Sequence, residues 1–185
     1  MGLTGFSFEL FQKYAKKGDS ILELGEQTIY FGGDYGKSAK PMFEKMGHKH
    51  TSIDANGQNG SIVYDLSVKH YFDEFAIITD FGTSEHVRDS LYNCWWNKHQ
   101  ACKIGGLIIS ENPKTGNWAG HGHWYYTQDF YINFAKEQGY GIMEIGEHPA
   151  MHNTTDGWNV YCVLKKTKQD FITEDQFNKL GIKNA

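Results

Sequence analysis

FAIITDFGTSEHV, residues 75–87, shows the pattern on which the predicted fold is built. Its first seven residues are almost all apolar, which predicts a buried strand over 75–81 that ends beside Asp80 and Gly82. Four other segments repeat this design, in which a short apolar strand runs into an acidic residue: SILEL (20–24), TSID (51–54), SIVYDL (61–66) and GGLIISEN (105–112). Such strands, separated by helical segments, predict a doubly wound α/β sheet.

The helical segments are recognised by apolar residues at helical spacing and by their capping residues. Helices are predicted over 7–17, 37–47, 87–102 and 129–138, with a short one after Thr173. Ser7 and Thr127 are the expected N-caps, Pro41 fits a first turn, and Thr173 with Gln176 has the form of a capping box. Trp95 and Trp96 are expected in the core.

Two further strands, 140–147 and 158–166, complete a sheet of seven. About ten residues without a helical pattern separate them. A parallel return needs a longer crossover, so these two strands are expected to pair antiparallel. The prediction is a mostly parallel seven-stranded sheet with one antiparallel strand.

Length and composition narrow the function. The chain has 185 residues, which predicts one domain over 1–185. Its net charge is −4, so the charge gives no reason to expect duplex nucleic acid as a partner. The three cysteines lack any Cys-x-x-Cys spacing and are predicted to be reduced packing residues. No apolar run is long enough for a membrane span. A cytoplasmic location is expected.

The ends of the predicted strands are where a ligand is expected, because open α/β sheets bind ligands outside the carboxyl ends of their strands. Asp54 is placed to accept hydrogen bonds from a ribose diol, and Asp65 from an adenine amino group. Gly25 and Gly82 allow the backbone to approach a ligand closely.

ILELGEQ, TSIDANG, VYDLS, FAIITDFGTSEHV and GGLIISENP resemble, in order and spacing, the strand ends of class I S-adenosylmethionine-dependent methyltransferases. The resemblance covers about residues 18–165 and implies a Rossmann-like core over 18–166, preceded by a helix in 1–17 and followed by a helical tail over 167–185. It also implies S-adenosylmethionine as cofactor and an oxygen or nitrogen of a small molecule or exposed group as acceptor. The cofactor-binding residues that it implies are Glu23, Gly25 and Glu26 for the methionine part, Asp54 and Ala55 for the ribose, Asp65 and Leu66 for the adenine, and Asp80, Phe81 and Gly82 between cofactor and acceptor.

Histidines follow the later strands on the same edge: His86, His121, His123, His148 and His152. A neutral imidazole there can remove a proton from an attacking oxygen or nitrogen. Glu85, His86, His121 and His123 are therefore the candidate catalytic residues. Metal binding by two or three histidines is the alternative, but no helical His-Glu-x-x-His pattern fixes a ligand geometry, so no metal site is predicted.

Two other functions compete with methyl transfer. Glu26, Gln27 and Thr28 stand where the family usually has further glycines, which leaves open a non-catalytic binding module. FGGDYGKSAK (31–40) supplies half of a phosphate-binding loop, but Phe31 stands where its first glycine belongs. Among the aromatic residues, Trp118, Trp124, Tyr125 and Tyr126 are candidates to line an acceptor pocket.

Overall fold

The computed structural model describes residues 2–150 and 157–184. Its strands are β1 (Gly2–Leu3), β2 (Ser20–Leu24), β3 (Thr28–Ile29), β4 (Lys49–Asp54), β5 (Ile62–Val63), β6 (Phe75–Phe81), β7 (Cys102–Pro113), β8 (Trp124–Tyr125), β9 (Gly141–Pro149), β10 (Trp158–Lys165) and β11 (Lys183–Asn184). Its helices are α1 (Gly5–Tyr14), α2 (Lys40–Lys45), α3 (Leu91–Ala101), α4 (Gln128–Gln138) and α5 (Glu174–Asn178), and short 3-10 turns lie at η1 (Gly32–Asp34), η2 (Gln58–Gly60) and η3 (Ser84–His86).

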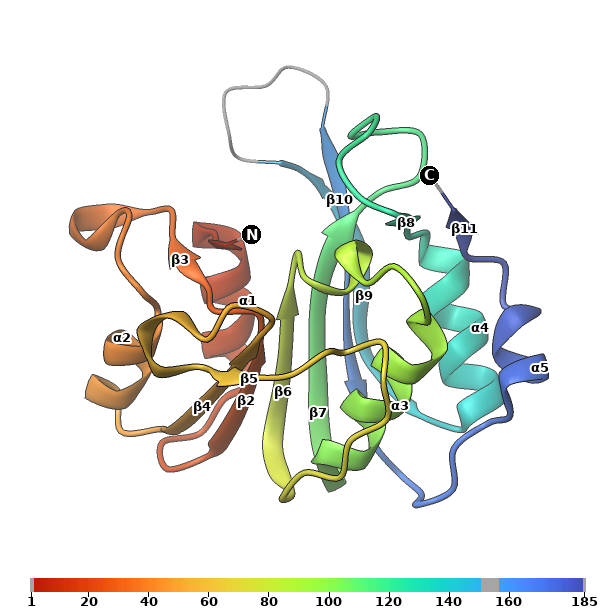
Figure 1. Ribbon diagram of the computed structural model, residues 1–185, viewed down its shortest axis with the longest axis horizontal. Coiled ribbons are helices and arrows are strands. Elements are labelled where there is room, and N and C mark those ends of the chain that lie inside the picture. Colours follow the sequence, from red (N-terminus) through yellow and green to blue (C-terminus); the bar gives the residue numbers. More distant parts are fainter. Residues whose placement is uncertain (1, 151–156, 185) are drawn as a thin grey trace.

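The main sheet has the strand order β5-β4-β2-β6-β7-β10-β9. β5, β4, β2, β6 and β7 run parallel, while β10 is antiparallel to both β7 and β9. This confirms the predicted mostly parallel seven-stranded sheet. From β2 the chain first builds β4 and β5 on one side and then returns to β6 on the other. The order therefore reverses between β2 and β6, whose ends meet at the pair Leu24 and Asp80 (Figure 1). Ligands bind in the crevice at such a switch point.

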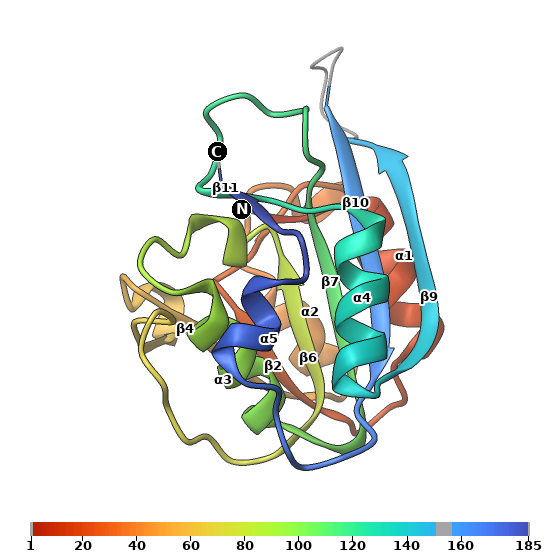
Figure 2. The same cartoon turned by 90° about the vertical axis from the view of Figure 1, so that its right-hand side faces the viewer.

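Helices cover both faces of this sheet. α3, α4 and α5 lie against one face, and α1 and α2 lie behind the other (Figure 2). Each face has its own buried cluster: Trp95 and Phe130 belong to the first, and Phe11 and Phe43 to the second. The two apolar layers fix the sheet in place, so its carboxyl edge is free to carry polar groups.

The first helix begins earlier than predicted. Its N-cap is Thr4, whose hydroxyl accepts a hydrogen bond from the Ser7 backbone N–H, while the Ser7 hydroxyl accepts one from the Thr4 N–H. Ser7 was expected as the cap and is instead the reciprocal partner at the third helical position, because either hydroxyl satisfies the local rule. The helix ends at Tyr14 rather than residue 17, since Asp19 accepts the Lys16 N–H and holds a turn there.

The third predicted strand is much shorter than the range 61–66. Only Ile62 and Val63 pair with β4, and both side chains are exposed. β5 is the edge strand, so no strand of the described residues pairs with its outer side. The chain leaves the sheet at Tyr64, and Asp65 then accepts the Ser67 N–H in a turn.

The remaining elements follow the predicted order with shifted ends. α2 covers only 40–45 of the range 37–47, with Pro41 in its first turn. α3 begins at Leu91 instead of residue 87, because the Ser90 hydroxyl accepts the Asn93 N–H and caps the helix. The N-caps at Thr127 and at Thr173, the latter in a full capping box, are confirmed.

The two tryptophans on α3 that were predicted in the core differ in burial. Trp95 is fully buried, as expected, but Trp96 is partly exposed and packs edge-on against Tyr71. The helix turns these neighbours to different sides, so only one can face the sheet. The three cysteines are free and buried, as expected of packing residues.

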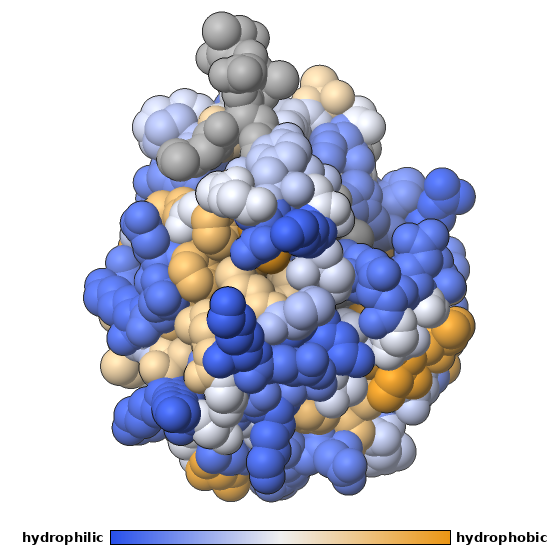
Figure 3. All heavy atoms as spheres, turned by 90° about the vertical axis from the view of Figure 1, so that its left-hand side faces the viewer, coloured by the Kyte–Doolittle hydropathy of each residue, from blue (hydrophilic) through white to orange (hydrophobic). Residues whose placement is uncertain are grey.

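On the face in Figure 3, charged and polar residues predominate, and apolar residues gather in an area left of the centre and in a separate patch at the right edge. Within residues 2–150 and 157–184, no helix has both the length and the apolar character needed to cross a membrane.

Candidate functional site

Two neighbouring cavities open at the carboxyl edge of the sheet, and residues 82–86 lie between them. The first, the Asp54 cavity, measures about 460 Å³, and its lining includes Gly25, Asp54, Ala55, Asp65, Leu66, Thr83, His86 and Val87. The second, the Glu85 cavity, measures about 680 Å³, and its lining includes Gly2, Thr4, Tyr30, Gly82, Glu85, Glu111, Asn112, Trp118 and His121. Gly82 and Glu85 face one cavity while Thr83 and His86 face the other, so this short segment separates them.

Asp54 is held in place by backbone donors. Its Oδ2 accepts the Glu26 N–H at 2.8 Å, and its Oδ1 accepts the Asn56 N–H at 3.0 Å. Gly25 makes this geometry possible, because its φ of 73° lies in the left-handed region and lets the loop after β2 turn back toward β4. A carboxylate has about four acceptor positions, so two remain for a ligand.

Asp65 and Leu66 form the next part of the same cavity. The Ser67 hydroxyl and backbone N–H both donate to Asp65 Oδ1, at 2.7 and 2.9 Å, and these hydrogen bonds lower the pKa of the carboxyl group. Leu66 is 8% exposed and supplies apolar surface beside it. The cavity therefore combines two carboxyl groups with an apolar wall.

Three of the acidic residues predicted to bind the cofactor line neither cavity. Glu23 is buried beneath the sheet edge, 3.3 Å from His50 Nε2, and burial raises the pKa of its carboxyl group. Asp80 is also fully buried, and it pairs with Lys98 from α3. Burial opposes ionisation of Asp80, but the Lys98 ammonium outweighs it, so the pKa of Asp80 is lowered. Glu26 reaches the site through its backbone N–H.

Asp80 instead organises the segment between the cavities. Its Oδ1 accepts the backbone N–H groups of Thr83 and Ser84, at 3.2 and 3.0 Å, and its Oδ2 accepts the Ser84 hydroxyl at 2.6 Å. The carboxylate thereby caps the η3 turn and fixes residues 83–86. Phe81 and Gly82, the other two residues predicted between cofactor and acceptor, line the Glu85 cavity.

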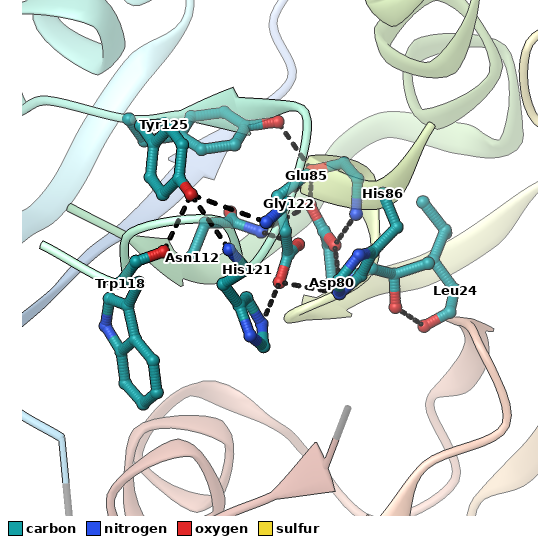
Figure 4. Close-up of polar contacts among 12 residues, drawn as sticks. Leu24, Asp80, Glu85, His86, Asn112, Trp118, His121, Gly122 and Tyr125 are labelled. Carbon is teal, nitrogen blue, oxygen red and sulfur yellow. Dashed lines mark hydrogen bonds and ion pairs between the residues drawn. The ribbon is translucent and has the colours of Figure 1, made fainter. Parts of the chain in front are cut away.

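Glu85, His86 and His121 converge at the border of the two cavities (Figure 4). Glu85 Oε1 lies 3.6 Å from His86 Nε2 and 3.8 Å from His121 Nε2. Burial, reinforced by Asp80, raises the pKa of Glu85 to about 8. Burial also lowers the pKa of His86 to about 4 and lowers that of His121. Both imidazoles are therefore neutral near pH 7, with lone pairs available.

The loop that carries His121 is fastened directly to Glu85. The His123 N–H donates to the Glu85 carbonyl at 2.7 Å, and the Tyr125 hydroxyl accepts the His121 N–H at 3.1 Å. Gly122 lies so close that a Cβ there would meet Glu85 Cγ and its carbonyl oxygen at 3.0 Å. A side chain at residue 122 would push the loop away.

Other predicted residues take different places. His123 accepts a hydrogen bond from Arg88 Nε at 3.0 Å, on the exposed side of the loop. His148 lies 3.0 Å from Glu111 and stacks on Phe6, and His152 falls outside the described residues. Of the aromatic candidates, Trp118 lines the Glu85 cavity.

Trp124, Tyr125 and Tyr126 serve the surrounding framework. The Trp124 indole donates to the Val87 carbonyl, and the Tyr126 hydroxyl lies 2.5 Å from the Ser84 hydroxyl. Of the half phosphate-binding loop, Tyr35 lines the Glu85 cavity, but Lys37 is exposed and pairs with Asp34, and α2 begins only at Lys40. That arrangement offers no helix N-terminus directly after the loop.

Several residues that line the site are not among the predicted site residues. Gly2, Thr4 and Tyr30 line the Glu85 cavity because β1 pairs with β3 across the sheet edge. Glu111 and Asn112 end β7 there. Glu111 in GGLIISENP is an acidic residue at the end of a predicted strand, as Asp54 is. This pattern is the signal that could have identified Glu111 and its neighbour Asn112.

Comparison with known proteins identifies the fold. No family model matches the chain, and no curated protein matches its sequence. Among solved structures, the 1,6-didemethyltoxoflavin-N1-methyltransferase of Burkholderia thailandensis, solved with its substrate and S-adenosylhomocysteine, is 13% identical with a TM-score of 0.66, over 89% of this chain and 78% of that one. A SAM-dependent methyltransferase from Methanosarcina mazei is 12% identical with a TM-score of 0.63, over 90% and 99%.

A TehB-like SAM-dependent methyltransferase from Corynebacterium glutamicum is 20% identical with a TM-score of 0.60, over 87% of each chain. Together with the strand order, these likenesses show that the chain has the class I S-adenosylmethionine-dependent methyltransferase fold.

Proposed function

We propose that this chain binds S-adenosylmethionine in the Asp54 cavity and transfers its methyl group to an oxygen or nitrogen of a small molecule or exposed group in the Glu85 cavity. One observation carries the proposal. Gly25, Asp54 and Asp65 follow three different strands, yet they line a single cavity at the switch point of the sheet. Ligands of this fold class bind at that place.

The residues of the Asp54 cavity fit an adenosyl group chemically. Asp54 is an oriented, acceptor-only group and suits two ribose hydroxyls, which can both donate. Asp65 can accept from an exocyclic amine, and Leu66 with Val87 offers apolar surface to a flat base. The volume of about 460 Å³ is in the usual range for ligand sites.

The arrangement of the two cavities suits a transfer between two bound molecules. Held by Asp54 and Asp65, S-adenosylmethionine would supply an electrophilic methyl group to the acceptor in the Glu85 cavity, and the acceptor would release its proton to solvent. The chain's own contribution is alignment. Asp80 and Lys98 hold residues 83–86 rigidly between the cavities, and fixed geometry lowers the entropic part of the barrier.

Calorimetry with S-adenosylhomocysteine tests cofactor binding, and methyl transfer from labelled S-adenosylmethionine to a panel of hydroxyl and amine compounds tests the reaction. We expect one molecule bound per chain and label transferred to at least one class of compound. The proposal would be refuted if the donor and its product gave no binding heat in calorimetry and no thermal stabilisation. The small substrate bound by the Burkholderia neighbour supports including compounds of that size.

A second function is favoured by one specific observation. The Gln27 side chain is fully buried after β2, where its amide donates to the Leu24 carbonyl and to the Thr83 hydroxyl. It fills space at the strand end that a glycine would leave to a ligand. A binding module without catalysis predicts stabilisation by S-adenosylmethionine but no transferred label with any acceptor.

A further inference from the structure

We propose that Glu85, His86 and His121 form a site for a divalent transition-metal cation, at the border between the Asp54 and Glu85 cavities. The sequence favours acid–base roles for these residues, because their spacing matches no helical metal-binding pattern. Their convergence arises in the fold: Glu85 and His86 lie on the η3 turn, and His121 comes from the loop before β8.

The donor atoms are close to the spacing that a small cation requires. One atom from each of the three residues lies within 4.8 Å of both others. Two ligands bound about 2.1 Å from one cation are roughly 3.0 to 3.6 Å apart, and the measured separations from Glu85 Oε1 are 3.6 and 3.8 Å. Small side-chain rotations would bring the three donors onto a common ion.

Glu85 provides a second, independent observation. Its side chain is fully buried, and Oε1 has no hydrogen-bond partner among the described residues. Oε2 is occupied by the Asn112 amide at 3.2 Å, and the two imidazoles are too distant from Oε1 for hydrogen bonds. An unsatisfied buried carboxyl oxygen is costly, and its position between two histidines leaves it open to a compensating group. A cation supplies one.

The surroundings hold the donors in place before any ion binds. The His123 N–H donates to the Glu85 carbonyl, and the close packing of Gly122 on Glu85 brings the His121 loop onto the η3 turn. The Trp118 ring lies 5.3 Å from the His121 ring. Such supporting contacts orient ligands and strengthen metal sites. The positive charge of the nearby Lys98 is compensated by its ion pair with Asp80, so it does not oppose the binding of a cation.

Two imidazole nitrogens and one carboxylate oxygen suit zinc, iron, cobalt or manganese better than magnesium, which prefers oxygen ligands. Three protein ligands leave coordination positions open, and Glu85 and His121 both line the Glu85 cavity. An oxygen of the acceptor could occupy one of these positions. That role rests on the proposed function and favours hydroxyl acceptors, whereas the metal site itself does not depend on methyl transfer.

The test uses the full chain after treatment with a chelator and dialysis. Calorimetry with Zn²⁺ and visible absorption with Co²⁺ give the affinity and the coordination. We expect one ion per chain, a Co²⁺ spectrum more intense than that of the hexaaqua ion, and at least a tenfold loss of affinity in Glu85→Gln and in His121→Ala. His123→Ala is the matched control, because it removes a histidine of the same loop that faces Arg88. It should bind as the wild type does.

The proposal is wrong if the wild type binds no ion, or if His121→Ala and His123→Ala bind Zn²⁺ equally. Circular dichroism of each variant excludes loss of folding as the cause. S-adenosylhomocysteine binding, measured on the same metal-free samples, separates the two proposals. Nucleoside binding without metal binding overturns the metal site alone, and metal binding without nucleoside binding overturns the proposed methyl-donor site alone.

Discussion

Asp54 offers the sharpest test of cofactor binding. Its two oxygens accept the Glu26 and Asn56 N–H groups at 2.8 and 3.0 Å, which leaves one further acceptor position on each oxygen. Hydrogen bonds to a charged group contribute about 1.5 to 3 kcal/mol each. Two bonds to one diol are not independent, so we expect Asp54→Ala to cost about 3 kcal/mol. That corresponds to a roughly hundredfold higher Kd for S-adenosylhomocysteine.

Calorimetry on a matched series checks this value. Asp54→Asn keeps the shape but loses the charge, and its amide NH2 must face one of the two backbone N–H groups that the aspartate accepts, so its Kd should rise by at least tenfold. Asp34→Ala removes an exposed carboxylate that pairs with Lys37 outside both cavities, and it should change nothing. A product analogue that lacks one ribose hydroxyl should lose less affinity from Asp54→Ala than the natural product does. Wild-type binding that survives Asp54→Ala within twofold contradicts the reasoning.

Three further outcomes follow from buried groups. Burial lowers the pKa of His99 to about 4, so as the pH falls the imidazole is protonated in the unfolded chain before it is protonated in the folded one. The contribution of neutral His99 to the free energy of unfolding is therefore complete above about pH 6.5 and falls by about 2 to 3 kcal/mol toward pH 4. Urea unfolding across that range should show a shallower pH dependence in His99→Gln, and an unchanged slope would disprove it. Lys98→Met leaves Asp80 buried without its partner and should destabilise the chain by about 3 to 5 kcal/mol, whereas adding Asp80→Asn should recover part of that loss in the same assay. Gly122→Ala should displace the His121 loop and weaken Zn²⁺ binding by about tenfold, and equal affinity in calorimetry would show that the loop position does not matter.

The sequence was sufficient for the architecture because local patterns determine it. Apolar runs of strand length, such as 75–81, alternate with helical spacing, and this alternation leaves few possible topologies. The short connection before β10 requires an antiparallel return. In the main sheet and its helices the errors lie at element ends: the hydroxyls of Thr4 and Ser7 obey the same capping rule, and only the folded chain shows which one starts the helix. The two small sheets β1-β3 and β8-β11 were not predicted, because strands of two residues carry no periodic pattern.

The residues of the candidate site could be predicted only in part from the sequence. Asp54 and Asp80 look alike in sequence, since each is an acidic residue at the end of a strand, but Asp54 lines a cavity while Asp80 is buried against Lys98. The difference depends on α3, which places its lysine beneath β6, and no local pattern reports a contact of that kind. A predicted strand end therefore shows at which edge of the sheet an acidic residue lies, but not which groups face its carboxylate.

The succession of strands along the chain, the antiparallel pairing of the last two and the edge at which polar residues gather could be inferred from the sequence, because they depend on short-range hydrophobic patterns and chain connectivity. Which of those residues meet depends on the folded chain. Glu85 and His86 are neighbours in the chain, but His121 joins them through a glycine packed on Glu85 and a backbone hydrogen bond. Such contacts arise from the packing of distant segments, which leaves no periodic signal in the residues that make them.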